Sequence, residues 1–153
     1  MAEKLLALAF ESDDPITLYI GSPGGHVESG DTIFDLIRYI KPEVRIIGTG
    51  WVGSIATHIY LAADKDNRLA LPNTRFLIHQ PSGGFGGDAA DIEIHAREIL
   101  KTRERINGII AERTGQSVER VSEDTQRDYW MSAEESVEYG LVGKIINDIS
   151  EVS

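Results

Sequence analysis

The sequence predicts an α/β fold built from repeated strand, turn and helix units. ITLYI at 16–20 runs into the glycine turn GSPGG at 21–25, and VRIIG at 44–48 runs into Thr49 and Gly50. Each is a short apolar run closed by glycine and followed by apolar residues at helical spacing. The longest periodic segment, 89–113, predicts a helix longer than a compact domain usually contains. We therefore expect part of that helix to project from the body and to pack on a partner.

The other elements follow in order along the chain. The pattern EKLLALAF at 3–10 predicts an amphipathic helix from the first residues, as though an earlier segment were missing. Further helices are expected between the first glycine turn and Lys41-Pro42, after Ser54, over 118–124, and from the capping-box sequence SAEE at 132–135. Further strands are expected at 68–71, 75–79 and 144–149. A C-cap is expected at Thr114-Gly115, the end of the longest helix.

Composition restricts the classes of function. A chain of 153 residues with 41% hydrophobic content is expected to form one domain, 1–153. The formal charge of −10 argues against a nucleic-acid partner. Without cysteine, covalent chemistry must use Ser, Thr, Lys or a carboxylate. No apolar run approaches the roughly 20 residues that span a bilayer, and no signal peptide is recognisable, so we expect a cytoplasmic protein without a membrane partner.

Ser54 is the first candidate for chemistry. It follows Gly50 and Gly53 and opens the apolar run SIATHIYLAA. A turn between strand and helix exposes a hydroxyl at the first helical turn, where backbone N–H groups lack intrahelical partners and the helix dipole favours negative charge. A nucleophile there would find an oxyanion donor in the N–H of Ile55. The alternative is that Ser54 only caps the helix.

The sequence pattern alone does not identify which histidine and which carboxylate would act with Ser54. His79 ends a predicted strand, where functional groups gather, while His58 lies one turn after Ser54 on the same helix. His26 follows a glycine pair and His95 falls within the long charged helix. An orienting carboxylate could come from Glu123, Asp124 or Asp128. The pair Gly24-Gly25 would let the backbone approach a ligand closely and aim N–H groups into a site.

Together these motifs resemble the proteolytic subunit of the Clp protease, ClpP. The resemblance covers almost the whole chain and rests on these motifs: SPGG at 22–25, Ser54 among small residues, LPN at 71–73, IHQP at 78–81, DIEIHAREILKTRE at 91–104, ERTGQS at 112–117, the DTxRD pattern at 124–128, SAEE at 132–135 and EYGLV at 138–142. It implies an α/β fold of the ClpP/crotonase type, with a long handle helix. Beside this helix, the glycine-rich segment 82–87 would form a strand.

The resemblance also implies a catalytic triad. Ser54 would be the nucleophile, His79 the general base and Asp128 the carboxylate that orients the imidazole. The N–H groups of Gly25 and Ile55 match the oxyanion hole of the family. These assignments imply a serine endopeptidase that degrades unfolded polypeptides delivered by an AAA+ unfoldase.

The implied assembly is a homo-oligomer of two stacked heptamers. Gln126 and Arg127 fall at the interface between the rings, and Gln126 stands where the family often has an acidic residue. From the resemblance, we expect the amino-terminal gating segment of the family to be absent from this chain. No metal site or organic cofactor is expected, and ATP would be used by the unfoldase rather than by this chain.

Departures from the family pattern surround the serine. Trp51 brings an indole near the nucleophile, and His58 and Tyr60 stand where smaller or apolar residues are common. Trp51 and Gln126 keep a catalytically silent, structural subunit of a mixed ring as an alternative, against which the retention of all three triad residues argues. An acyl-CoA enzyme of the crotonase type is a third reading, which the coincidence of Ser54, His79 and Asp128 disfavours.

Overall fold

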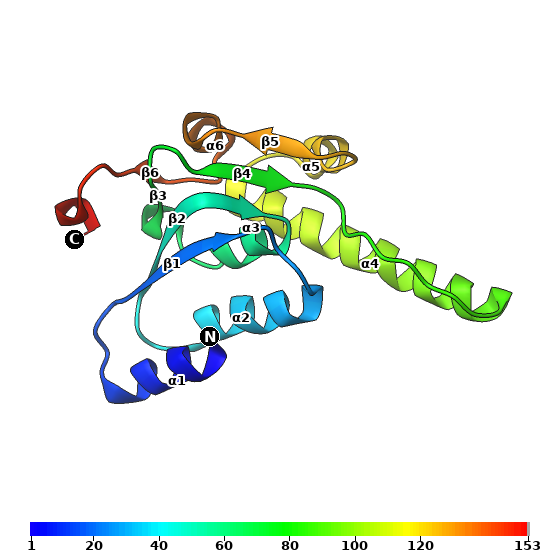
Figure 1. Cartoon of the computed structure of the whole chain (residues 1–153), viewed down its shortest axis with the longest axis horizontal. Coiled ribbons are helices and arrows are strands. Elements are labelled where there is room, and N and C mark those ends of the chain that lie inside the picture. Colours follow the sequence, from blue (N-terminus) through cyan, green and yellow to red (C-terminus); the bar gives the residue numbers. More distant parts are fainter. Residues whose placement is uncertain (153) are drawn as a thin grey trace.

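The computed structural model describes residues 1–152 and contains a curled sheet flanked by helices (Figure 1). The elements in order are α1 (Ala2–Glu11), β1 (Ile16–Ser22), α2 (Val27–Tyr39), β2 (Val44–Gly53), α3 (Ile55–Tyr60), η1 (Lys65–Asn67), β3 (Arg68–Ala70), β4 (Arg75–Ile78), α4 (Ala89–Thr114), α5 (Val118–Asp124), β5 (Tyr129–Met131), α6 (Ala133–Tyr139), β6 (Lys144–Ile145) and η2 (Ile149–Val152). The expected alternation of strands and helices over 16–60 is confirmed.

Strand β2 organises the sheet. Its first half pairs in parallel with β1 and β3, and its second half pairs in parallel with β4. Strand β3 pairs in parallel with β6, and β4 pairs antiparallel with β5. Because one long strand changes partners along its length, the sheet curls around the point where β2 ends, and Ser54 follows at that point.

The core is apolar and lies where the helices meet the sheet. Ile46, Val52, Phe76 and Leu141 are among its fully buried members. Helix α2 packs on α3 so closely that a Cβ at Gly30 would stand 2.1 Å from Cγ1 of Ile55. This contact fixes the helix that begins immediately after Ser54.

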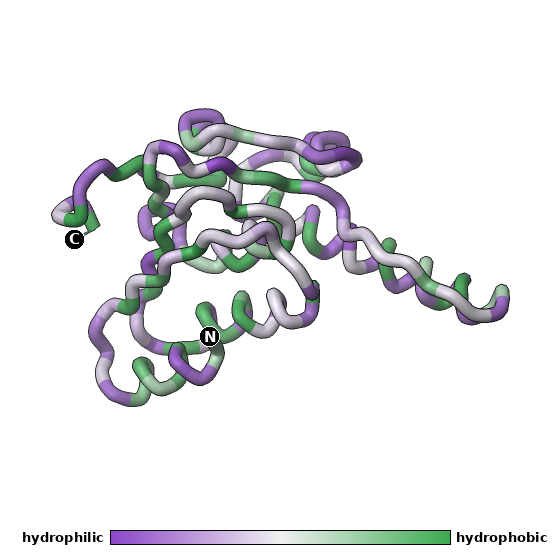
Figure 2. The backbone as a smooth tube through the Cα atoms, in the orientation of Figure 1, coloured by the Kyte–Doolittle hydropathy of each residue, from purple (hydrophilic) through white to green (hydrophobic). Residues whose placement is uncertain are grey.

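Helix α4 extends well beyond the body, as expected from its length (Figure 1). No residue of its first part, 89–105, is buried, whereas Ile106 and Ile110 belong to the core. The hydropathy view shows apolar positions along the projecting part (Figure 2). Ile92, Ile94 and Leu100 are exposed there.

Three expectations about strands need correction. Strand β2 runs to Gly53 instead of ending at 48, because its second half pairs with β4. The last strand contains only 144–145, and a 3-10 helix follows at 149–152. Segment 82–87 forms no strand. In Figure 1 this segment runs beside α4. A strand requires backbone hydrogen-bond partners, and a helix does not offer them because its own backbone groups are already paired.

The helix ends follow the sequence closely. Oγ of Ser132 accepts a hydrogen bond from the Glu135 N–H, and the Glu135 carboxylate accepts one from the Ser132 N–H, which forms the expected capping box. Gly115 closes α4 with φ 80°, as predicted. Within residues 1–152, no helix combines the length and the apolar character needed to cross a bilayer.

Candidate active site

Ser54 occupies a strained turn between β2 and α3. Its φ of 57° and ψ of −128° make it the one non-glycine residue with positive φ among those that the structure describes. Such a backbone conformation costs about 1–3 kcal/mol and persists where the surrounding structure enforces it. The Ser54 side chain makes no capping hydrogen bond to α3. The reading of Ser54 as a simple helix cap is therefore wrong.

The structure brings Ser54, His79 and Asp128 into one line of contacts. Nε2 of His79 lies 2.8 Å from Oγ of Ser54, and Nδ1 lies 3.0 Å from Oδ1 of Asp128. A carboxylate on Nδ1 holds the imidazole proton at that nitrogen, which leaves the lone pair of Nε2 free to accept the proton of the serine hydroxyl. Residues separated by up to 74 positions thus meet in a geometry suited to nucleophilic catalysis.

The segment that carries Asp128 is fixed from both sides. The Gln80 N–H donates to the Thr125 carbonyl at 2.8 Å, and the Gln80 side-chain amide donates to the Gln126 carbonyl at 3.0 Å. The Thr125 hydroxyl is buried and contacts Oδ1 of Asn107 at 3.1 Å. These bonds tie the residue after His79 to the turn before Asp128, so the spacing between imidazole and carboxylate is set by the fold.

The glycine turn after β1 lies against the nucleophile. A Cβ at Gly24 would stand 2.7 Å from Cβ of Ser54, and Gly24 has φ 104°, so only glycine fits there. Gly25 follows with φ 154°. Ile55 is the first residue of α3, and its N–H therefore has no intrahelical acceptor. The assignment of the Gly25 and Ile55 N–H groups to an oxyanion hole stays a prediction.

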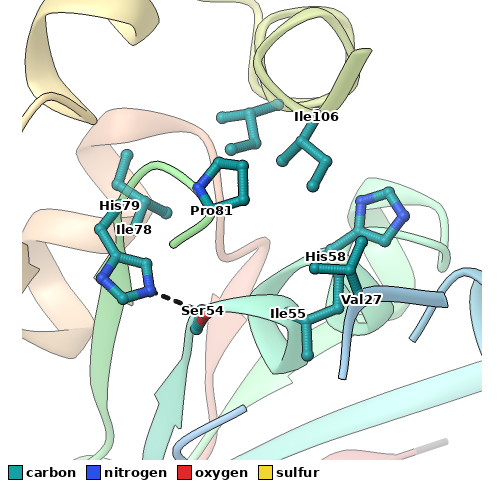
Figure 3. A pocket seen from close by; sticks show the side chains of 9 residues that line it. Val27, Ser54, Ile55, His58, Ile78, His79, Pro81 and Ile106 are labelled. Carbon is teal, nitrogen blue, oxygen red and sulfur yellow. Dashed lines mark hydrogen bonds between the residues drawn. The ribbon is translucent and has the colours of Figure 1, made fainter. Parts of the chain in front are cut away.

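A narrow pocket opens beside the serine (Figure 3). Its volume is about 20 Å³, and its lining comprises Val27, Ser54, Ile55, His58, Ile78, His79, Pro81, Ile106 and Ile110. Most of these side chains are apolar. A cavity of this size has room for about one water molecule, and it adjoins the hydroxyl of Ser54.

The other histidines do not reach the serine. His58 is buried, with Nε2 3.1 Å from Oδ1 of Asp31. His26 contacts Ser29 and Glu28, and His95 stacks on Phe85. Of the three candidate carboxylates, only Asp128 contacts a histidine; Asp124 instead accepts a hydrogen bond from the Tyr139 hydroxyl. The sequence does not predict the contact of His58 with Asp31, since the two residues are 27 positions apart and share no motif.

The indole of Trp51 lies outside the pocket. It covers Gly53 and packs on Trp130, with ring centroids 5.4 Å apart, and the guanidinium of Arg75 sits over Trp130. Strand β5, which carries Trp130, was not expected because three residues are too short for a recognisable alternation. Its pairing with β4 directs the indole of Trp51 away from the pocket.

We expect His58 to make the fold sensitive to mild acid. Burial lowers the pKa of His58 below 6.5, although the carboxylate of Asp31 raises it in part. Below pH 6.5 the unfolded chain therefore binds a proton that the folded chain does not, so the free energy of unfolding falls as the pH drops toward the folded pKa. Urea unfolding measured from pH 7.5 to pH 5 should show that the free energy of unfolding declines less in His58→Gln than in the parent. The matched variant His26→Gln, at an exposed histidine, should decline as the parent does; an equal decline in all three would contradict this role.

Comparison with known proteins agrees with this architecture. The family model described as Clp protease matches residues 1–148. The chain is 58% identical over 152 residues to ATP-dependent Clp protease proteolytic subunit 3 of Rhizobium meliloti, covering 99% of this chain and 78% of that protein. It is 57% identical over 153 residues to proteolytic subunit 2 of Pseudomonas aeruginosa, covering 100% of this chain and 76% of that protein.

A solved structure of a ClpP1 mutant from Listeria monocytogenes superposes with a TM-score of 0.93. It is 53% identical in sequence, and the match covers 99% of this chain and 85% of that one. The expected ClpP-type α/β fold is thereby confirmed. On the strength of the family model, the relatives and the shared fold, this chain belongs to the Clp protease family, a family of serine endopeptidases.

Proposed function

We propose that this chain is a catalytically competent subunit of a Clp-type protease, in which Ser54, His79 and Asp128 form the triad. The observation that carries the proposal is the pair of contacts made by His79, 2.8 Å to the Ser54 hydroxyl and 3.0 Å to the Asp128 carboxylate. The strained backbone at Ser54 supports it, because strain of this kind gathers at functional sites.

The reaction follows from these positions. Oγ of Ser54 attacks the carbonyl carbon of the peptide bond while its proton passes to Nε2 of His79. The N–H groups of Gly25 and Ile55 stabilise the negative charge on the carbonyl oxygen. His79 then gives its proton to the leaving amine, and water hydrolyses the acyl ester by the same steps, which regenerates the Ser54 hydroxyl. Asp128 stabilises the charged imidazolium throughout.

We further propose that the chain assembles with copies of itself and receives unfolded polypeptides from an AAA+ unfoldase. The projecting part of α4 supports assembly, since its exposed Ile92, Ile94 and Leu100 have no cover within the described chain. Two stacked heptamers are the arrangement we expect, with Gln126 and Arg127 near the contact between rings. A cytoplasmic location and independence from any cofactor accompany this proposal.

The proposal is tested by treating the protein with a fluorophosphonate and measuring both its intact and its native mass. Labelling at Ser54 in a fourteen-subunit particle that cleaves peptides is the expected result. An assembled particle that stays unlabelled would overturn competence and indicate a structural subunit of a mixed ring. A labelled monomer would retain the triad but overturn the proposed assembly.

Replacing Asp128 with Asn should lower kcat by about 10²–10⁴-fold, with little change in KM. The amide of Asn can hold the His79 imidazole in the wrong tautomer, a change that lowers kcat by about 10⁴-fold in a buried triad. We include the smaller value because the Asp128 side chain is 65% exposed, so water screens it. The steady-state rate on a fluorogenic peptide gives the measurement. Asp124→Asn is the matched control, because its carboxylate contacts Tyr139 and not His79; an equal loss in both variants would contradict the role of Asp128.

A further inference from the structure

His79 and Asp128 lie just past the end of the ladder between β4 and β5. The last pair of that ladder joins the final residue of β4 to the first residue of β5, so His79 follows it on one side and Asp128 precedes it on the other. Beyond this pair, the Gln80 N–H donates to the Thr125 carbonyl at 2.8 Å. The spacing of imidazole and carboxylate is therefore set by the sheet at one end and by Thr125 at the other.

Thr125 is itself fastened to helix α4. It caps the end of α5 and is 1% exposed. Its hydroxyl lies 2.8 Å from the Val121 carbonyl oxygen and 3.1 Å from Oδ1 of Asn107, and the Asn107 amide donates to Oγ of Ser122 at 3.4 Å. Helix α5 packs on α4 near the place where α4 joins the body (Figure 1). Asn107 thus links α4 to the turn that leads into Asp128.

Packing alone does not account for an amide at position 107. Asn107 is 4% exposed and lies on the part of α4 that enters the core, with Ile106 and Ile110. The other buried polar residue of α4, Thr114, donates to the Ile110 carbonyl within the same helix, whereas the hydrogen bonds of Asn107 reach another element. Burying an amide is unfavourable unless its hydrogen bonds are made, and an apolar residue would not carry that cost. The amide at this place therefore contributes position more than burial.

One side of this link is open. A surface cavity of about 300 Å³ is lined by Gln80, Arg103, Glu104, Asn107, Val118, Ser122, Thr125 and Gln126. On that side the link faces space instead of the close-packed neighbours that usually fix core side chains. Within the described chain, hydrogen bonds must therefore do more than packing to fix where Thr125 and Gln80 lie.

We infer that Asn107 is a positioning residue for the proposed reaction. Asn107 holds the Thr125 hydroxyl, and the Thr125 carbonyl holds Gln80. This chain of contacts keeps Asp128 within 3.0 Å of the His79 imidazole, where its carboxylate stabilises the imidazolium. The inference rests on the proposed peptidase function and deepens it. Because Asn107 acts through Asp128, its loss should lower kcat and leave KM nearly constant.

The experiment compares the assembled parent with Asn107→Leu, each also in the Asp128→Asn background. Asn107→Leu alone should lower kcat by about 10- to 100-fold, because a displacement of about 1 Å can cost about 10²-fold in rate. Once Asp128 has become Asn, the contact that Asn107 maintains is already lost, so Asn107→Leu should add at most about a twofold loss. The rate at which a fluorophosphonate labels Ser54 gives a second measure where cleavage is slow.

Conservative changes separate positioning from packing. Thr125→Val removes the hydroxyl that meets Asn107 and should lose kcat as Asn107→Leu does, whereas Thr125→Ser keeps the hydroxyl and should keep most of the parent kcat. Thr114→Val is the matched control, because it removes a buried hydroxyl whose bond to the Ile110 carbonyl stays within α4. It should lower the free energy of unfolding in urea without changing kcat.

The outcomes separate the two proposals. An assembled Asn107→Leu protein with the parent kcat, or one whose loss is just as large in the Asp128→Asn background, overturns the inference and leaves the proposed function intact. A parent that is neither labelled at Ser54 nor active on peptides overturns the proposed function, and the inference with it. Where Asn107→Leu does not assemble, the two Thr125 variants decide: equal kcat in Thr125→Val and Thr125→Ser overturns the inference.

Discussion

Replacing Ser54 with Ala is expected to lower kcat on model peptides by about 10⁴- to 10⁶-fold. The variant removes the atom that would attack the peptide carbonyl, and triad serines in other proteases have effects of this size. The remaining rate would come from the oxyanion donors and from binding. KM should stay nearly constant, since the pocket beside Ser54 is lined mainly by side chains that the change does not touch.

The double variant gives the sharper test. Because Ser54 and His79 act as one unit, Ser54→Ala combined with His79→Ala should be no slower than Ser54→Ala alone. Ser12→Ala, at an exposed serine that follows α1, controls for loss of a hydroxyl elsewhere. A Ser54→Ala protein that is assembled by native mass spectrometry and cleaves peptides as fast as the parent would remove the basis of the proposed function.

Replacing Gly24 with Ala should nearly abolish catalysis without removing any functional group. The added Cβ would stand 2.7 Å from Cβ of Ser54 and 2.8 Å from the Gly53 carbonyl oxygen, and alanine is strained at φ 104°. The turn or the nucleophile must therefore move, and a displacement of about 1 Å can cost about 10²-fold in rate. We expect kcat to fall by at least 10²-fold by this estimate.

The measurement for Gly24→Ala is peptidase activity beside fluorophosphonate labelling. Labelling should slow with the rate of cleavage, because both need the same position of the Ser54 hydroxyl. Gly108→Ala is the matched control: it lies within α4 where an added Cβ meets open space, and it should be active. Full activity of Gly24→Ala would show that the turn does not position the nucleophile.

Much of the architecture was predictable from local patterns. Helix α4, its C-cap at Gly115 and the capping box at Ser132 each depend on residues near one another in the chain, and all three were confirmed. Strand β5 was missed, because its three residues carry no period of their own and form a strand only through β4. The second half of β2 was missed for the same reason.

The site, too, could be predicted from the sequence only in part. Resemblance in motif named Ser54, His79 and Asp128, and in the structure His79 contacts both of the others. Composition and spacing alone had left four histidines and three carboxylates open, since none of these patterns encodes which distant groups meet. The position of Trp51, directed to Trp130 instead of the pocket, likewise depends on the pairing of β4 with β5.

The sequence by itself determined the repeated strand and helix units and the long projecting helix, and its resemblance to ClpP named the family and the three residues of the proposed triad. The units and the helix follow from short-range periodicity and capping residues, and the resemblance rests on motifs that are contiguous in the chain. Only the tertiary structure decided that Ser54 adopts φ 57°, that Gly24 has no room for a side chain, and that Asp31 and Arg105 hold His58 at the end of the pocket. The reason is physical: strain, close packing and the pairing of a buried imidazole are properties of groups that meet only when distant segments fold together.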